Sequence, residues 1–338
     1  MKILIFEYIT GGGFNKQYLP SALLAEGRLM LQALLDDMRR YAKLGHELEV
    51  VVMLDERLKT LINTSSGMQV VFIAPEQNAT DEFKRLVQHC DAIWPIAPEF
   101  DGLLQSLCQS VADLNKLLLT SPAQVVALTG DKWLSYQYFK QYHIATVPSR
   151  LFTGVDQYDQ QQGGDSTWVV KPLDGVGCVD SYILREREDF IAMQARSGRY
   201  IIQPQLSGLT TSLSCLFKQG RGWLLCANQQ HFTIINQQYH LTQLVVNHSP
   251  NLEAYSALVD AIAQSLPALW GYVGIDLIET PEQTWVLEIN PRLTTSYVGI
   301  HEALGINVVE AVMQLIRGEP LLKTQDRQAV TLQVSSCL

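Results

Sequence analysis

The sequence lacks the features that mark membrane-spanning, disulfide-rich and zinc-binding proteins. No apolar run in its 338 residues approaches the roughly 18 residues that cross a bilayer. Its six cysteines form no Cys-x-x-Cys pair, and its seven histidines stand at no metal-ligand spacing, so we expect reduced thiols in a cytoplasmic protein. The opening residues Met1–Phe6 look like the start of a signal peptide, but Glu7 interrupts them and a glycine run follows. We therefore expect a first β-strand there.

Positive charge is also scarce. The formal net charge is −9, whereas a broad nucleic-acid surface needs clustered lysine and arginine. We expect no nucleic acid and no membrane among the partners, and any anionic ligand must be held by local cations. Hydrophobic residues make up 47% and charged residues 17% of the chain, as in ordinary globular proteins. At roughly 100 to 200 residues per domain, the length predicts two or three domains.

Apolar periodicity in the first third of the chain predicts strands that alternate with helices. The expected strands are 2–8, 49–54, 69–73 and 92–96, and the expected helices are 21–44, 81–90 and 103–118. Such alternation indicates a parallel sheet with ligands at the carboxyl ends of its strands. Glu7, Tyr8, the turn Gly11-Gly12-Gly13 and residues 95–99 would lie at that edge. The glycine run lacks the Gly-x-Gly-x-x-Gly spacing of a dinucleotide site, so it is either a substrate-contacting turn or an ordinary loop.

The most informative stretch is a pair of apolar segments, 271–278 and 285–292, joined by the turn 280–283. Together they predict a β-hairpin. Because side chains alternate along a strand, Asp276, Glu288 and Asn290 can share one face of it. Two carboxylates and an amide among apolar neighbours are suited to Mg²⁺, and Arg292 adds a planar cation for phosphate or carboxylate. The alternative is a surface hairpin whose polar residues face water.

Two lysines upstream suit a phosphate group. Asp131 is placed to cap a helix that runs to about residue 142, and a lysine in its first turn, Lys132, opposes the helix dipole, which hints at a ligand. Lys171 ends the apolar strand 168–172 and is followed by the glycine loop Asp174-Gly175-Val176-Gly177, a combination suited to gripping phosphate oxygens. The alternative for that loop by itself is a simple hairpin turn.

The remaining chain is expected to form strands and helices around a less regular stretch. We expect helix 188–198, strands 147–152, 179–184, 200–205, 213–218 and 223–228, an irregular region with His231, His240 and His248, helix 251–270, and a last helix 308–317.

Taken in order, these motifs resemble the ATP-grasp superfamily: Lys132, Lys171 with its glycine loop, the stretch 203–206, and Asp276 with Glu288-Ile289-Asn290-Pro291-Arg292. The resemblance covers nearly the whole chain. It implies an ATP-grasp fold of mixed α/β and α+β class, with an N-terminal parallel-sheet pre-ATP-grasp domain. The implied domains are 1–118, the pre-ATP-grasp domain; 119–203, the N-terminal ATP-grasp subdomain with the glycine loop as a flap; and 204–330, the C-terminal subdomain with the metal site.

The resemblance also implies a role for each motif. The phosphates of ATP would be held by Lys132, Lys171, Asp174, Gly175 and Gly177, and the adenine by Gln203, Gln205 and Leu206. Asp276, Glu288 and Asn290 would hold Mg²⁺, two ions by the family pattern, with Mn²⁺ as a substitute. Arg292 and Lys171 would act in catalysis, and Glu7, Tyr8, Gly11, Gly12, Gly13 and Arg292 would contact substrate. One departure is that Gly208 is followed by Leu209 rather than the glutamate that many relatives use for the ribose.

The implied activity is ligation of a carboxylate to an amine through an acyl phosphate, with release of ADP and phosphate. Phe6-Glu7-Tyr8 and Thr10-Gly11-Gly12 look most like the tyramine:glutamate ligase branch of methanofuran biosynthesis. Nothing in the residues themselves selects those two small molecules. A kinase that phosphorylates a small hydroxyl compound and a non-catalytic nucleotide-binding regulator are the alternatives. Members of the superfamily are often dimers, so a homodimer is also implied.

Overall fold

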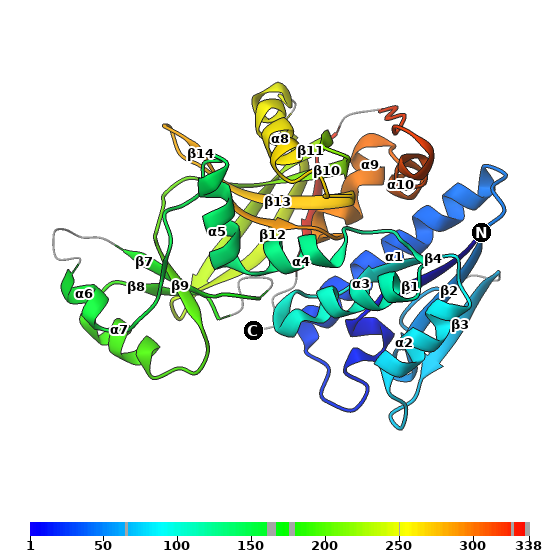
Figure 1. Ribbon diagram of the computed structural model, residues 1–338, viewed down its shortest axis with the longest axis horizontal. Helices are drawn as coiled ribbons and strands as arrows, with labels where there is room; N and C mark the ends of the chain where they lie inside the picture. The colour runs from blue at the N-terminus through cyan, green and yellow to red at the C-terminus, as the bar shows by residue number, and fades with distance from the viewer. Residues whose placement is uncertain (65–66, 161–166, 176–179, 250, 326–327, 335–338) are drawn as a thin grey trace.

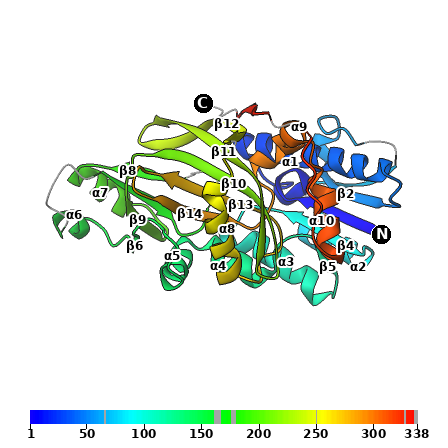
Figure 2. The same ribbon diagram turned by 90° about the horizontal axis from the view of Figure 1, so that it is seen from above.

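The computed structural model describes residues 1–64, 67–160, 167–175, 180–249, 251–325 and 328–334. It contains two β-sheets. Figures 1 and 2 both place the N-terminal sheet with α1 to α3 at one end of the molecule, strands β7 to β9 with α6 and α7 at the other end, and β10 to β14 between them.

The N-terminal sheet is entirely parallel, with strand order β3-β2-β1-β4-β5. Its strands are β1 (Lys2–Glu7), β2 (Glu49–Asp55), β3 (Met68–Ile73), β4 (Ala92–Ile96) and β5 (Leu117–Leu118). The helical segments around it are η1 (Ile9–Gly13), α1 (Ser21–Lys43), η2 (Glu56–Leu58), α2 (Ala79–Gln88), η3 (Phe100–Gly102) and α3 (Leu103–Asp113). This confirms the predicted parallel sheet.

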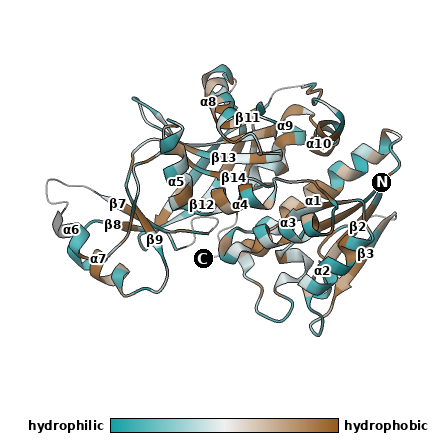
Figure 3. Cartoon of the chain, viewed as in Figure 1, coloured by the Kyte–Doolittle hydropathy of each residue, from teal (hydrophilic) through white to brown (hydrophobic). Residues whose placement is uncertain are grey.

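Both faces of this sheet are covered. In β1, Ile3 and Ile5 point into one hydrophobic core, and Leu4 and Phe6 into a second on the opposite face, as strand alternation requires. Figure 3 shows hydrophobic residues along these strands and a mixture of hydrophobic and hydrophilic residues along α1. One expectation was wrong: the helix that begins at Leu103 ends at Asp113 rather than residue 118. Asn115 takes a positive φ of 53°, which breaks the helix and lets β5 join the sheet.

The second sheet has ten strands in the order β14-β13-β10-β11-β12-β8-β7-β9-β6, with β15 paired to β12. Its strands are β6 (Arg150–Leu151), β7 (Trp168–Pro172), β8 (Tyr182–Leu184), β9 (Tyr200–Pro204), β10 (Leu209–Lys218), β11 (Arg221–Ile235), β12 (Gln238–Ser249), β13 (Gly271–Glu279), β14 (Thr284–Asn290) and β15 (Val330–Gln333). The helical segments are α4 (Ala123–Gly130), α5 (Lys132–Gln141), α6 (Asp156–Gln160), α7 (Arg187–Gln194), α8 (Glu253–Ser265), η4 (Thr295–Gly299), α9 (Ile300–Leu304) and α10 (Val308–Arg317).

Two features of this sheet bear on the sequence predictions. The hairpin β13–β14 forms as predicted, with Asp276 directly opposite Glu288. The stretch expected to be irregular is instead ordered, since β11 and β12 form a long hairpin that carries His231, His240 and His248. Polar residues interrupt its apolar alternation, so the local pattern was too weak to predict it, and pairing with β10 on one side supplies the missing stabilisation.

The two sheets share a hydrophobic core. One cluster of buried side chains joins Ile3 of β1 and Leu34 of α1 to Tyr297 of η4 and Val312 of α10. Tyr297 also donates a hydrogen bond of 2.7 Å to the buried carboxylate of Asp37 in α1. Helix α1 is therefore held against the second sheet, and side chains on its first turns are positioned against the end of β14.

Four of the six cysteines, Cys90, Cys108, Cys215 and Cys226, are buried free thiols, as expected. Cys178 and Cys337 lie outside the described residues. In the described part of the chain, no helix combines the length and apolar character that a membrane crossing requires.

Candidate active site

The hairpin β13–β14 brings Asp276, Glu288 and Asn290 together. The amide of Asn290 donates to Oδ2 of Asp276 at 2.9 Å, and the amide of Gln230 in β11 donates to Oδ1 at 3.0 Å. Burial first, and then the neighbouring charge of Glu288, raise the pKa of Asp276 to about 7. Two partly buried carboxylates face each other here, an arrangement that a cation would relieve.

The donor set fits Mg²⁺. The described residues contain no group of three or more histidine, cysteine, aspartate or glutamate side chains that could hold a metal ion, so a site rich in protein ligands is absent from that part of the chain. Mg²⁺ instead takes one or two carboxylates and keeps positions for water and phosphate oxygens. Asp276 and Glu288 meet that requirement, and Asn290 adds an amide oxygen.

Lys132 and Lys171 lie next to this pair of carboxylates. Lys132 is the first residue of α5, whose amino end is capped by Asp131 through bonds of 2.9 Å from the amides of Trp133 and Leu134. Its Nζ lies 3.3 Å from Oε2 of Glu288 and donates to the carbonyl of Gly175 at 3.2 Å. Burial opposes the charge of Glu288, but Lys132 and Lys171 outweigh it, so the pKa of Glu288 lies below its usual range.

Three cavities that share lining residues run past these groups. The first, of about 440 Å³, is mostly apolar and is lined by Val147, Val169, Lys171, Ser181, Gln203, Pro204, Gln205, Leu206, Ser207, Gly208, Thr210, Phe232, Tyr239, Ile278 and Leu287. Lys171 also lines the second cavity, of about 130 Å³, which contains Lys132, Gly175, Asp276 and Glu288. The predicted hinge and the predicted phosphate and metal residues therefore border connected space.

The third cavity is smaller, about 70 Å³, and lies against the N-terminal sheet. Glu7, Ile9, Gly27 and Arg292 are among its lining residues. Glu26 lines both the second and the third cavity. The three cavities thus form a row from the apolar hinge, past the carboxylates, to Arg292.

Arg292 makes three hydrogen bonds within the described part of the structure. Its Nε and Nη2 donate to the two carboxylate oxygens of Glu99 at 2.9 Å and 2.8 Å, and Nη1 donates to the carbonyl of Leu293 at 3.0 Å. The side chains of Arg292 and Glu99 are 11% and 5% exposed, so this is a buried, bidentate ion pair. It ties the end of β14 to the loop after β4.

Glu7 is buried at the end of β1. Its carboxylate accepts hydrogen bonds from the amides of Ile9 and Thr10 and from the Thr10 hydroxyl, at 3.2, 2.7 and 2.6 Å. Burial raises the pKa of Glu7 in spite of these bonds. Helix α1 passes close by at Gly27, where an added Cβ would come within 2.6 Å of Oε2 of Glu7.

That close approach gives a stability prediction. In an ordinary helix, replacing glycine by alanine stabilises by up to about 1 kcal/mol. Gly27→Ala is expected to destabilise the protein instead, by about 1 to 3 kcal/mol, because the methyl group must displace the buried carboxylate of Glu7. Urea unfolding followed by circular dichroism measures the change. An increase in stability would show that α1 can shift away from β1.

The side chains of three other predicted residues make hydrogen bonds within the protein. Asp174 does not line the second cavity; its Oδ2 accepts a hydrogen bond from the amide of Asp101 at 2.9 Å. The side chains of Gln203 and Gln205 bond to Ser149 and Tyr239, at 2.7 Å and 2.6 Å. Gly177 lies outside the described residues, as do residues 176–179.

Tyr8 and the turn Gly11-Gly12-Gly13 line none of these three cavities, as far as the described residues define them. The turn packs inside the N-terminal domain: an added Cβ on Gly11 would lie 2.6 Å from the ring of Phe6. Substrate contact by these four residues stays a prediction.

Sequence reasoning missed two carboxylates of this region. Residues 95–99 were expected at the ligand edge, but no role was assigned to Glu99, which pairs with an arginine 193 positions away. Glu26 was not identified at all. The sequence did contain a sign of it, because Glu26 lies at helical spacing between Leu23 and Met30 on the apolar side of α1. Burying a charged side chain on that side costs free energy.

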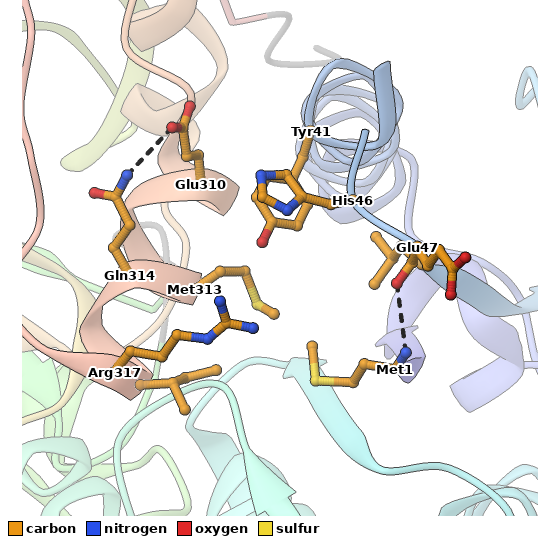
Figure 4. A pocket seen from close by; sticks show the side chains of 10 residues that line it. Met1, Tyr41, His46, Glu47, Glu310, Met313, Gln314 and Arg317 are labelled. Atoms are coloured by element: carbon orange, nitrogen blue, oxygen red, sulfur yellow. Dashed lines mark hydrogen bonds between the residues drawn. The ribbon is translucent and has the colours of Figure 1, made fainter. Parts of the chain in front are cut away.

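A fourth cavity, of about 260 Å³, lies at the carboxyl end of α1 and shares none of its described lining residues with the other three. In Figure 4, Met313 and Arg317 of α10 extend toward the side of the cavity that holds the stacked rings of Tyr41 and His46, whereas Gln314 bonds to Glu310. It contains no pair of facing carboxylates and lysines of the kind found beside Asp276.

The fold and this row of cavities indicate a nucleotide-binding protein. Comparison with family models identifies the family. The model of the ATP-grasp domain matches residues 129–296, and the model of the pre ATP-grasp 3 domain matches residues 48–126. The chain belongs to the ATP-grasp superfamily, as the sequence resemblance predicted.

Individual relatives are distant in sequence. The tyramine–L-glutamate ligase of Methanocaldococcus jannaschii is 22% identical over 306 residues, which cover 88% of this chain and 84% of that protein. A solved structure from Archaeoglobus fulgidus, described as an ATP-grasp superfamily protein, superposes with a TM-score of 0.70 at 23% identity, covering 98% of this chain and 92% of that one.

The biotin carboxylase domain of the 2-oxoglutarate carboxylase of Hydrogenobacter thermophilus, solved with MgADP, ADP and bicarbonate, superposes with a TM-score of 0.68 at 16% identity. That match covers 96% of this chain and 71% of the other. At these identities the solved structures show the fold alone.

Proposed function

We propose that this protein is an ATP-dependent ligase that joins a carboxylate to an amine and releases ADP and phosphate. The observation that carries the proposal is the row of three connected cavities. An apolar cavity for a base, a cationic and acidic cavity for phosphates and metal, and a third cavity at Arg292 together accommodate a nucleotide and further substrates.

The site residues divide among these tasks. We propose that the adenine lies in the first cavity against the backbone of Gln203, Gln205 and Leu206, and that Lys132 and Lys171 hold the phosphates. Both lysines already lie beside the acidic hairpin, where their charges balance Glu288. Gly175 borders the second cavity, and we retain Asp174 and Gly177 as parts of the same phosphate loop. Ribose contacts are left without an assigned residue.

Asp276, Glu288 and Asn290 are the residues that would hold Mg²⁺. When bound, the metal would neutralise charge that develops on the transferred phosphate. Two ions, and substitution by Mn²⁺, follow the family pattern and belong to the proposal. The domain division 1–118, 119–203 and 204–330 is retained on the same basis, as is a homodimeric state.

Lys132, Lys171 and Arg292 would each act in the reaction. Lys132 and Lys171 orient the phosphates so that an oxygen of the carboxylate substrate attacks the terminal phosphorus. The bond from that phosphorus to the bridging oxygen breaks, ADP leaves, and an acyl phosphate is formed. Arg292, held at the end of β14, is placed to steady the negative charge of that intermediate. An amine then attacks the acyl carbon and phosphate leaves.

The particular substrates that we propose are glutamate, activated at its γ-carboxylate, and tyramine. Support comes from the name of the Methanocaldococcus relative, which aligns with 88% of this chain, and from the likeness of residues 6–12 to that branch.

ADP release is expected to require ATP, Mg²⁺, a carboxylate and an amine together, and to stop when EDTA removes the metal. A panel of carboxylates and amines that includes glutamate and tyramine, read by mass spectrometry, identifies the amide product. Omission of the amine is the matched control. Release of ADP that depends on a hydroxyl compound alone, with a phosphorylated product, would instead show a kinase.

A further inference from the structure

Glu26 stands where the second and third cavities meet. On one side it shares a cavity with Lys132, Lys171, Asp276 and Glu288, and on the other with Glu7 and Arg292. It comes from the second turn of α1, in the N-terminal part of the chain, whereas the two lysines and the acidic hairpin belong to the second sheet and its helices. A group at this junction lies between the phosphate end of a bound nucleotide and whatever occupies the third cavity.

The Glu26 carboxylate is held in place from one side. The hydroxyl of Thr295 donates to its Oε2 at 2.9 Å. Within the part of the chain that the structure describes, its Oε1 has no hydrogen-bond donor. Glu7, by contrast, already accepts three hydrogen bonds from Ile9 and Thr10. Glu26 therefore has an oxygen to offer to a ligand, and Glu7 supplies mainly charge.

The charge around the third cavity favours a cationic ligand. Three carboxylates, Glu7, Glu26 and Glu99, gather around one guanidinium, and Glu99 already occupies that guanidinium with a bidentate bond. Burial raises the pKa of both Glu7 and Glu26, which shows that the surroundings do not fully balance their charges. A primary ammonium group brings a positive charge and three hydrogen-bond donors to these carboxylates. A volume of about 70 Å³ has room for such a group.

Resting on the ligase function proposed above, we propose that the third cavity receives the primary amine substrate and that Glu26 is the group that takes its proton. The ammonium donates to Glu26, which removes one proton and leaves a neutral amine. The nitrogen lone pair then forms the C–N bond to the acyl carbon. The C–O bond to phosphate breaks with its electron pair on oxygen, and the second nitrogen proton leaves with the phosphate. Thr295 positions Glu26 for this step.

Hydroxylamine separates this role from the earlier steps. It is uncharged at neutral pH, so it attacks an acyl phosphate without a base and gives a hydroxamate. Glu26→Gln is expected to lower amide formation by about 100-fold or more, the usual contribution of a positioned general base. Hydroxamate formation from ATP, glutamate and hydroxylamine is expected to stay near the wild-type rate, because nucleotide binding and carboxylate activation do not use Glu26. Glu26→Asp, which keeps a carboxylate, is expected to recover part of the amide rate.

Each outcome of these assays either supports or overturns the proposal. Equal loss of amide and hydroxamate in Glu26→Gln, in a protein with an unchanged unfolding curve, would overturn it by showing that Glu26 supports the nucleotide site. Unchanged amide formation would also overturn it. If the wild-type protein makes neither hydroxamate nor ADP with any member of the substrate panel, the ligase function itself fails and this inference fails with it. Tyramine is the amine used first, and the best amine of the panel replaces it if another is turned over faster.

Discussion

Glu288→Gln is expected to abolish ADP formation while leaving the protein folded. Glutamine keeps the shape of the side chain but removes the charge that would hold Mg²⁺. Mutation of a residue that only hydrogen-bonds to a metal ligand lowers metal affinity or activity roughly 10- to 100-fold. The loss of activity in Glu288→Gln should be larger. Two changes in folding free energy oppose each other. Loss of the ion pair with Lys132, at 3.3 Å, lowers the stability of the protein. Removal of the Glu288 charge raises it, because that charge repels Asp276 and raises its pKa.

Steady-state ADP release and urea unfolding measure the two quantities on the same preparation. Glu282→Gln is the matched control, because Glu282 is exposed in the turn of the same hairpin and should keep full activity. Near-normal turnover in Glu288→Gln would show that the metal assignment is wrong. A protein that fails to fold would instead show that the Lys132–Glu288 pair is needed to assemble the site.

Arg292→Met is expected to lose both activity and stability. The substitution leaves Glu99, whose side chain is 5% exposed, as a buried charge without its partner, which costs about 3 to 5 kcal/mol. Activity is lost for a different reason, because no cation remains at the end of β14 to steady the acyl phosphate. A second substitution separates these two effects.

In the double variant Arg292→Met, Glu99→Gln, the buried charge of Glu99 is removed together with its partner. Most of the folding free energy should return, while ADP release should stay at the level of the single variant. The Glu99→Gln variant completes the cycle and isolates the coupling energy between the two side chains. Recovery of activity in the double variant would contradict a catalytic role for Arg292, and an unchanged unfolding midpoint in Arg292→Met would contradict the stabilising role of the pair.

Local patterns in the chain were sufficient to predict the elements that carry the acidic hairpin and the two lysines. Asp276 and Glu288 belong to strands of clear apolar character around a tight turn, which predicts the hairpin. A register shift between Asp276 and Leu277 sets Asp276 opposite Glu288 rather than Leu287, and the sequence pattern did not predict that shift. Lys132 and Lys171 were identified because each occupies a position that its helix or strand does not favour for a lysine. Where the apolar pattern was interrupted, as in β11 and β12, prediction failed, because neighbouring strands stabilise that hairpin.

The sequence alone determined the parallel N-terminal sheet, the hairpin β13–β14 and the family resemblance, since these depend on periodicity and on motifs in a fixed order. Only the tertiary structure decided which carboxylates surround Arg292. Glu99 and Glu26 come from the N-terminal domain, and their contacts with Arg292 and Thr295 span 193 and 269 positions of the chain. Contacts at such separations arise from the packing of α1 and β4 against the second sheet, through a shared core that no local pattern encodes.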